Sequence, residues 1–114
     1  MSQDHTGEMK ARMRSDLMAA IKGRRAEEIA LLRSLLAAID NAEAPAVGSI
    51  SGGSSEIERL ALTNAELEAI LLGEIRTRER AAAELASLGH VERADALLEQ
   101  AAIAGRYVGS IASM

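Results

Sequence analysis

Apolar residues recur every three or four positions along four stretches of the chain. The spacing is clearest over residues 27–43, where one side of a helix would carry Ile29, Leu32, Leu35, Leu36 and Ile39. The stretches 8–23, 63–88 and 91–108 share this periodicity. Such helices must bury their apolar sides against one another, so the pattern predicts an all-α, four-helix bundle-like single domain.

The residues expected on the buried sides can be listed for the other helices as well. In the first helix they are Met9, Met13, Leu17, Ala20 and Ile21. In the fourth helix they are Val91, Ala94, Leu97, Leu98, Ala101 and Ala102.

Local signals place the ends of these helices. Thr63 and Glu66 have the spacing of a capping box, which predicts that the third helix starts there. Gly23 and Gly89 follow apolar stretches and suit helix C-termini. Pro45 cannot continue a helix, so the second helix should end just before it.

The segments outside these stretches are expected to be less ordered. Residues 1–7 predict a disordered lead-in and residues 109–114 a frayed C-terminus. Between the second and third helices, residues 45–55 contain four Ser and three Gly, which is typical of a flexible loop. Residues 56–62 are expected to add one helical turn. The folded domain should therefore span residues 8–108.

The composition supports helices and narrows the classes of function. Hydrophobic residues make up 48% of the chain and aromatic residues only 1%, so the interior must be aliphatic, which favours closely packed helices over a sheet. The absence of Cys excludes disulfides and thiolate chemistry. The sequence contains no secretion signal and no apolar run of membrane-spanning length, so we expect a cytoplasmic protein that does not enter the membrane.

Charge is unevenly distributed along the chain. The net charge is −4, with +3 in residues 1–25 and −7 in residues 26–114. This balance disfavours attraction of the whole molecule to nucleic acid but allows a local basic patch. Arg76 and Arg80 are one helical turn apart, and Arg33 could join them in binding phosphates. A second source of cations is the end of the first helix, with Lys22, Arg24 and Arg25.

The alternative for these arginines is a structural network of Arg and Glu side chains. Glu74 and Arg78 have the favourable i, i+4 order for an ion pair within one helix. Such a network would hold helices together and would leave fewer cations for phosphates.

Residues suited to catalysis or metal binding are few. His5 and His90 are the only histidines, and neither belongs to a recognisable nucleophile motif. No Glu is followed three residues later by His, the spacing found in di-metal helical bundles. Paired carboxylates suit a solvated helix surface. We therefore expect no catalytic residue, no metal and no cofactor.

Several segments, taken in order, resemble the YqeY-like family, whose helical domain is shared with the C-terminal part of the B subunit of the tRNA-dependent amidotransferase. The segments lie between Met13 and Val108: Leu32 to Leu35, Ala37 to Glu43, Leu62 and Thr63, Glu74 to Arg80, Leu88 to His90, and Glu99 to Tyr107. The resemblance implies a helical domain that contacts tRNA and performs no chemistry itself. It also implies tRNA or an amidotransferase-type complex as partner.

The resemblance points to contact residues rather than catalysts. The positions that it carries over are Arg33, Asn41, Arg76, Arg78 and Arg80. Family membership brings a carbon–nitrogen ligase label with glutamine as amido donor, but this chain lacks the parts needed for that reaction. We therefore expect a binding module that is not an enzyme by itself.

Two other functions compete with this hypothesis. A protein–protein interaction or self-association module, without nucleic-acid binding, is indicated by apolar residues at the edges of their helical faces: Leu31, Leu72 and Ile103. Such a module would allow homo-oligomers. An enzyme acting alone would need a deep polar pocket around a titratable residue.

Overall fold

The computed structural model describes residues 5–44 and 61–112, which form four helices and, within those ranges, no strand. The helices are α1 (His5–Gly23), α2 (Ala26–Glu43), α3 (Asn64–Ser87) and α4 (Val91–Ala112). The prediction of an all-α protein with four helices is confirmed. The expected Gly/Ser-rich loop and most of the expected turn at 56–62 lie outside the described residues. No helix in the described ranges has both the length and the apolarity needed to cross a membrane.

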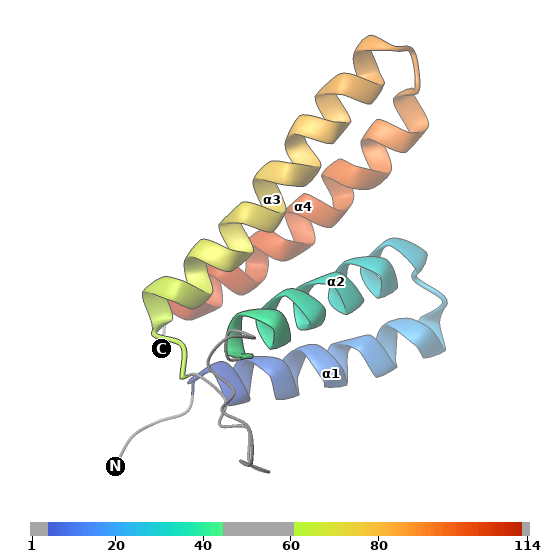
Figure 1. The fold of residues 1–114 in the computed structure, drawn as a ribbon. Coiled ribbons are helices and arrows are strands. Elements are labelled where there is room, and N and C mark those ends of the chain that lie inside the picture. The colour runs from blue at the N-terminus through green and yellow to red at the C-terminus, as the bar shows by residue number, and fades with distance from the viewer. Residues whose placement is uncertain (1–4, 45–60, 113–114) are drawn as a thin grey trace, which may run out of the picture.

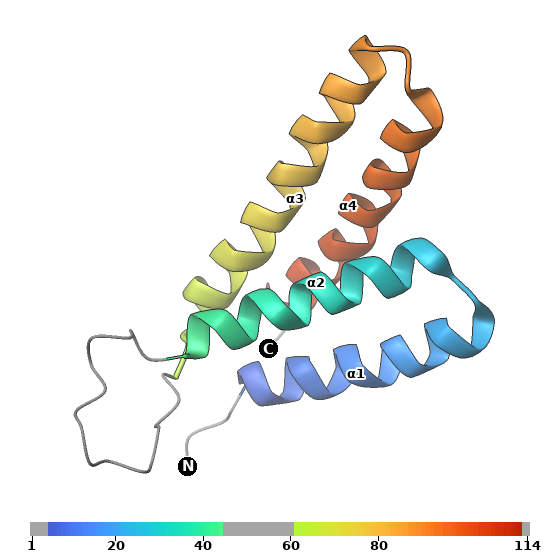
Figure 2. The same cartoon turned by 45° about the vertical axis from the view of Figure 1, so that its right-hand side comes forward.

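The helices form two hairpins that cross each other (Figures 1 and 2). One hairpin is α1–α2. The other is the longer α3–α4 hairpin, whose two helices lie side by side in both views. The α1–α2 hairpin covers only the part of α3–α4 that contains the start of α3 and the end of α4. The outer part of α3–α4, with its connecting turn, extends beyond α1–α2.

The hydrophobic core lies where the hairpins cross. Leu31, Leu32, Leu35 and Ile39 of α2 are completely buried, and α2 packs against each of the other helices. The other helices complete the core with Met9, Met13, Leu67, Leu71, Ile103, Ala104, Tyr107 and Ile111. The apolar stripe predicted for residues 27–43 is thus the centre of the fold, although Ile29 and Leu36 are only half-buried.

The exposed apolar residues show where the predicted faces were wrong. Val91 and Leu98 were expected to be buried on α4 but are 57% and 47% exposed. Ala102 and Ile21 are exposed as well. For Val91, Leu98 and Ala102 the reason is that α4 buries one side against α3 and another against α1–α2, and these three residues lie on neither.

The helix ends also differ from expectation at both ends of the described chain. Residues 5–7 belong to α1 instead of a disordered lead-in, and Thr6 is buried. At the other end α4 continues to Ala112, into the segment 109–114 that was expected to be frayed. Ile111 packs in the core, and this burial offsets the low helix propensity of Gly109.

The internal turns follow the predicted signals with one exception. Gly89 has a φ of +86°, the left-handed conformation in which glycine ends a helix without a Cβ clash. At the α1–α2 turn, Gly23 is the last residue of α1, and Arg24 takes the left-handed conformation with a φ of +55°. The amide of Arg25 closes this turn by donating to the carbonyl of Ala20 at 3.0 Å.

The capping box at the start of α3 is confirmed. Thr63 Oγ1 accepts a hydrogen bond from the Glu66 amide, and the Thr63 amide donates to Glu66 Oε1, both at 3.0 Å. The hydrogen bonds from Thr63 lower the pKa of Glu66 below its ordinary value of 4.5. The carboxylate form of Glu66 is therefore favoured in the folded protein.

We expect Thr63→Ala to lower the free energy of unfolding by about 1 kcal/mol, because the amide of Glu66 loses its acceptor. Urea unfolding followed by circular dichroism measures this loss. Thr77→Ala is the control, since Thr77 is exposed inside α3 and its hydroxyl donates only to the Gly73 carbonyl. Equal losses for the two variants would contradict a capping role.

The Glu66 carboxylate adds a pH dependence to the cap. Its folded pKa lies below its unfolded pKa, so its contribution is present above pH 4.5 and is lost as the pH falls through the folded value. Glu66→Gln should therefore be less stable than wild type at neutral pH and approach wild type in acid. A deficit that does not change with pH would contradict the capping box.

Candidate nucleic-acid interface

The eight candidate contact residues lie on three elements. Lys22, Arg24 and Arg25 surround the α1–α2 turn, Arg33 and Asn41 lie on α2, and Arg76, Arg78 and Arg80 lie on α3. In both views the α1–α2 turn is on the side of α4 that is away from α3 (Figures 1 and 2). The structure therefore separates the cations of the turn from those of α3.

Arg78 is engaged inside the protein. Its Nε donates to Gln100 Oε1 at 2.9 Å, and one terminal nitrogen donates to the Glu74 carbonyl and carboxylate, both at 3.0 Å. Gln100 Nε2 in turn donates to Glu27 Oε1 at 2.7 Å. The Arg78 side chain is only 11% exposed. This chain of hydrogen bonds joins α3, α4 and α2, so Arg78 belongs to a structural network that holds helices together. The predicted ion pair between Glu74 and Arg78 is confirmed.

Arg76 and Arg80 point away from this network. Residues two apart in a helix differ by about 200°, so the neighbours of an inward-facing Arg78 face outward. Both arginines are exposed and lie one turn apart. Neither makes an ion pair with any residue that the structure describes. Their surroundings on α3 include the small exposed residues Gly73 and Thr77, which leave the two guanidinium groups accessible.

The turn and α2 supply further exposed groups. Arg25 is paired with Glu28 at 2.9 Å, whereas Lys22 and Arg24 are exposed and form no ion pair within the described ranges. Arg33 and Asn41 are exposed on α2, about two turns apart. Arg33 is likewise without an ion-pair partner in the part of the chain that the structure describes.

A second polar cluster, not foreseen from the sequence, fixes α1 to α4. The hydroxyl of Tyr107 donates to Asp16, and the guanidinium of Arg12 lies 5.1 Å from the centre of the Tyr107 ring. Arg12 also donates to Ser110. Burial and the hydrogen bond to Asp16 raise the pKa of Tyr107 above its usual range. Tyr107 therefore stays a neutral hydrogen-bond donor, and this cluster is structural.

A third cluster joins the start of α1 to the end of α2. Lys10 Nζ lies 2.5 Å from Glu43 Oε1 and 3.2 Å from Asp40 Oδ1. Lys10 and Glu43 are both buried. Removing a charged group from water is strongly unfavourable unless the group is paired, as these two are. The sequence signal was weak, because Glu43 lies 33 residues from Lys10 along the chain.

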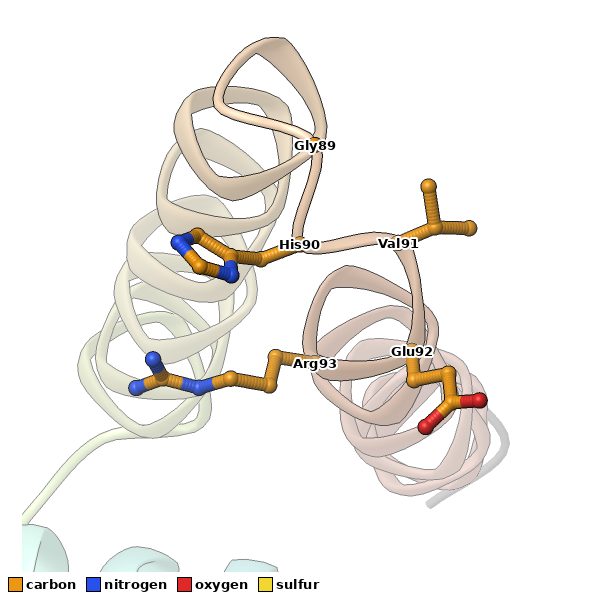
Figure 3. Close-up of a pocket in the computed structure, with 5 residues that line it drawn as sticks. All are labelled: Gly89, His90, Val91, Glu92 and Arg93. Atoms are coloured by element: carbon orange, nitrogen blue, oxygen red, sulfur yellow. The ribbon is translucent and has the colours of Figure 1, made fainter.

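A pocket lies at the tip of the α3–α4 hairpin (Figure 3). His90 and Arg93 extend in the same direction from the chain, while Val91 and Glu92 point away from them. His90 and Arg93 are both exposed, and the five lining residues include no Ser, Thr or Cys nucleophile. The titratable residues that line this pocket, His90, Glu92 and Arg93, are therefore exposed rather than enclosed. Within residues 5–44 and 61–112, no group of three His, Asp or Glu side chains could hold a metal ion.

Comparison with protein-family models, with curated proteins and with solved structures found no match for this chain. The resemblance to the YqeY-like family therefore stays a prediction made from the residues.

Proposed function

We propose that this chain is a helical module that binds folded RNA of the tRNA class and does no chemistry itself. The observation that carries the proposal is the pair Arg76 and Arg80, which are exposed, one turn apart and in no ion pair with a described carboxylate. The resemblance of the chain to YqeY-like domains supplies the class of partner.

The contrast with the other charged residues supports this assignment. Where a cation has a structural task, as in Lys10 and Arg78, the fold gives it carboxylate partners at 2.5 to 3.2 Å. Arg76 and Arg80 lie on the same helix as Arg78 but receive no such partner among the described residues. Guanidinium groups presented in this way suit the phosphates of a nucleic-acid backbone. With a single aromatic residue in the chain, base stacking is not the basis of recognition.

We expect the protein to bind unfractionated tRNA with an affinity that falls steeply with salt, since each neutralised phosphate releases counterions. The double variant Arg76→Ala/Arg80→Ala should weaken binding about tenfold at low salt and reduce the salt slope by about two. Fluorescence anisotropy of labelled tRNA, titrated at several KCl concentrations, measures both quantities. Arg33→Ala tests whether α2 contributes a further contact.

Arg14→Ala is the matched control. Arg14 is an exposed arginine on α1 with no ion pair to a described residue, and it is not among the candidate contacts. It should leave the affinity and the salt slope nearly unchanged. An equal effect of Arg14→Ala and the α3 variant, or no tRNA binding at about micromolar protein in low salt, would remove the proposal.

The earlier alternative of a protein-interaction patch formed by Leu31, Leu72 and Ile103 is wrong for two of the three residues. Leu31 is completely buried and Ile103 is 7% exposed, and both belong to the core. Leu72 is half-buried. Any apolar interaction surface must therefore lie elsewhere on the molecule.

A further inference from the structure

The side of α4 that faces away from α1–α2 carries an exposed apolar stripe. Gln100 and Tyr107 mark the opposite side, because they hydrogen-bond to side chains of α2 and α1. At about 100° per residue, Leu98 lies about 180° from Tyr107, and Val91 lies about 180° from Gln100. The exposed uncharged residues on this outward side are called the α4 stripe here: Val91, Leu98, Ala102, Gly105 and Gly109.

Side-chain size changes along the α4 stripe. The two large residues, Val91 and Leu98, lie in the N-terminal half of α4 and are 57% and 47% exposed. The small residues lie in the C-terminal half. A Cβ added at Gly105 would meet no atom within 4 Å, so packing in the described structure does not require glycine there. Glycine inside a helix lowers the stability of the helix. What glycine offers at such a position is room for another chain to approach the backbone closely.

Charge also changes along α4, from acidic in its N-terminal half to basic in its C-terminal half. On one flank of the stripe the spacing i, i+3, i+7 aligns Glu92, Asp95 and Glu99 in the N-terminal half. Arg106 lies on the same flank in the C-terminal half. All four are exposed, and none is in an ion pair with another described residue.

We propose that the α4 stripe is a self-association surface that pairs with the α4 stripe of a second copy in antiparallel orientation. A twofold axis places the same flank of both helices together, so each contact occurs twice. In this arrangement the large residues of one copy lie over the small residues of the other. The acidic half of each flank likewise faces the basic half of the other. A parallel pair would place large on large and would move the charged flanks of the two copies to opposite sides of the pair.

The change in side-chain size and the change in charge along α4 favour the same register of the antiparallel pair. In an antiparallel pair both helices rise 1.5 Å per residue in opposite directions, so the numbers of two residues that face each other have a constant sum. When Arg106 of one copy lies opposite Asp95 of the second, that sum is about 201. Leu98 then packs over Ala102 and Gly105 of the second copy, and Val91 packs over Gly109. Size and charge are independent properties of the sequence, and their agreement distinguishes a second copy from an unspecified apolar partner. The surface includes none of the residues proposed to bind RNA.

Sedimentation velocity of the full chain over a range of concentrations tests the proposal. Wild type is expected to form dimers, and Gly105→Gln is expected to be monomeric because the added side chain blocks the approach of the second helix. Since nothing lies within 4 Å of that Cβ, the variant should keep the helicity of wild type. Gly73→Gln is the matched control, because Gly73 is an exposed glycine of α3, has the same free space and lies outside the stripe.

Charge reversal tests the register. Asp95→Arg and Arg106→Glu should each weaken the homodimer roughly tenfold, since each places like charges together twice. An equimolar mixture of the two single variants should form a heterodimer with nearly the affinity of wild type, because both contacts then join opposite charges. Within one chain the two positions are about 16 Å apart along α4, so this rescue reports contact between copies.

Three results would overturn the proposal. One is a wild-type protein that remains monomeric at about 100 μM, a concentration at which a weak specific dimer is still populated. Another is a dimer that Gly105→Gln leaves intact. The third is a mixture of Asp95→Arg and Arg106→Glu that associates no better than either variant alone.

Discussion

Leu35→Ala is expected to lower the free energy of unfolding by about 3 kcal/mol. Leu35 is completely buried in the middle of α2, the helix that packs against the other three. Truncation removes the transfer energy of the lost methyl groups and leaves a cavity, which rigid helices on several sides can only partly close. Urea unfolding measured by circular dichroism gives the change.

Leu88→Ala is the control for this prediction. Leu88 follows α3 at the tip of the long hairpin and is 69% exposed. The same truncation should change the free energy of unfolding by no more than about 0.5 kcal/mol, because little apolar area is removed from a packed environment. A loss at Leu35 as small as that at Leu88 would contradict the placement of the core between the hairpins.

Arg78→Ala is expected to lower the free energy of unfolding by about 2 kcal/mol. The substitution leaves the amide oxygen of Gln100 and the carboxylate of Glu74 without their donor, and Gln100 is only 8% exposed. A buried polar group that loses its partner costs more than the hydrogen bond contributed. The aliphatic part of the arginine side chain also stops covering neighbouring apolar surface.

Arg76→Ala is the matched control, because it removes the same side chain two residues earlier on the same helix. Arg76 is exposed and has no described ion-pair partner, so its loss should stay within about 0.5 kcal/mol. The pair of variants thus separates two kinds of arginine. Stability should depend on Arg78, and tRNA affinity should depend on Arg76. The reverse outcome would contradict both assignments.

The fold could be predicted well where one local signal was strong. The apolar spacing of residues 27–43 and the capping box at Thr63 gave the bounds of α2 and the start of α3. Gly89 likewise ended the third helical segment with the expected left-handed conformation. These features depend on residues close in sequence, whose geometry follows from the backbone itself.

The errors occurred where burial depends on how far one hairpin covers another. Periodicity places Val91 and Leu98 on an apolar side of α4, but it does not tell which partner covers that side. Leu31 and Ile103 show the opposite error, because two packing partners widen the buried face of a helix. The same limit applies to the candidate site. The i, i+4 rule gave the Glu74–Arg78 pair, whereas the bond to Gln100 needed the tertiary fold.

The position of Tyr107 gives the protein a built-in optical reporter. The chain has no Trp or Phe, so this phenol is the source of its near-ultraviolet signal. Tyr107 lies where side chains of α1 and α4 meet. The guanidinium of Arg12 lies over its ring, and its hydroxyl donates a hydrogen bond to Asp16. Near-ultraviolet absorbance and emission therefore register the separation of the two hairpins at one defined point, whereas far-ultraviolet dichroism registers helix content. Docking of the hairpins and formation of their helices can thus be followed separately without any label.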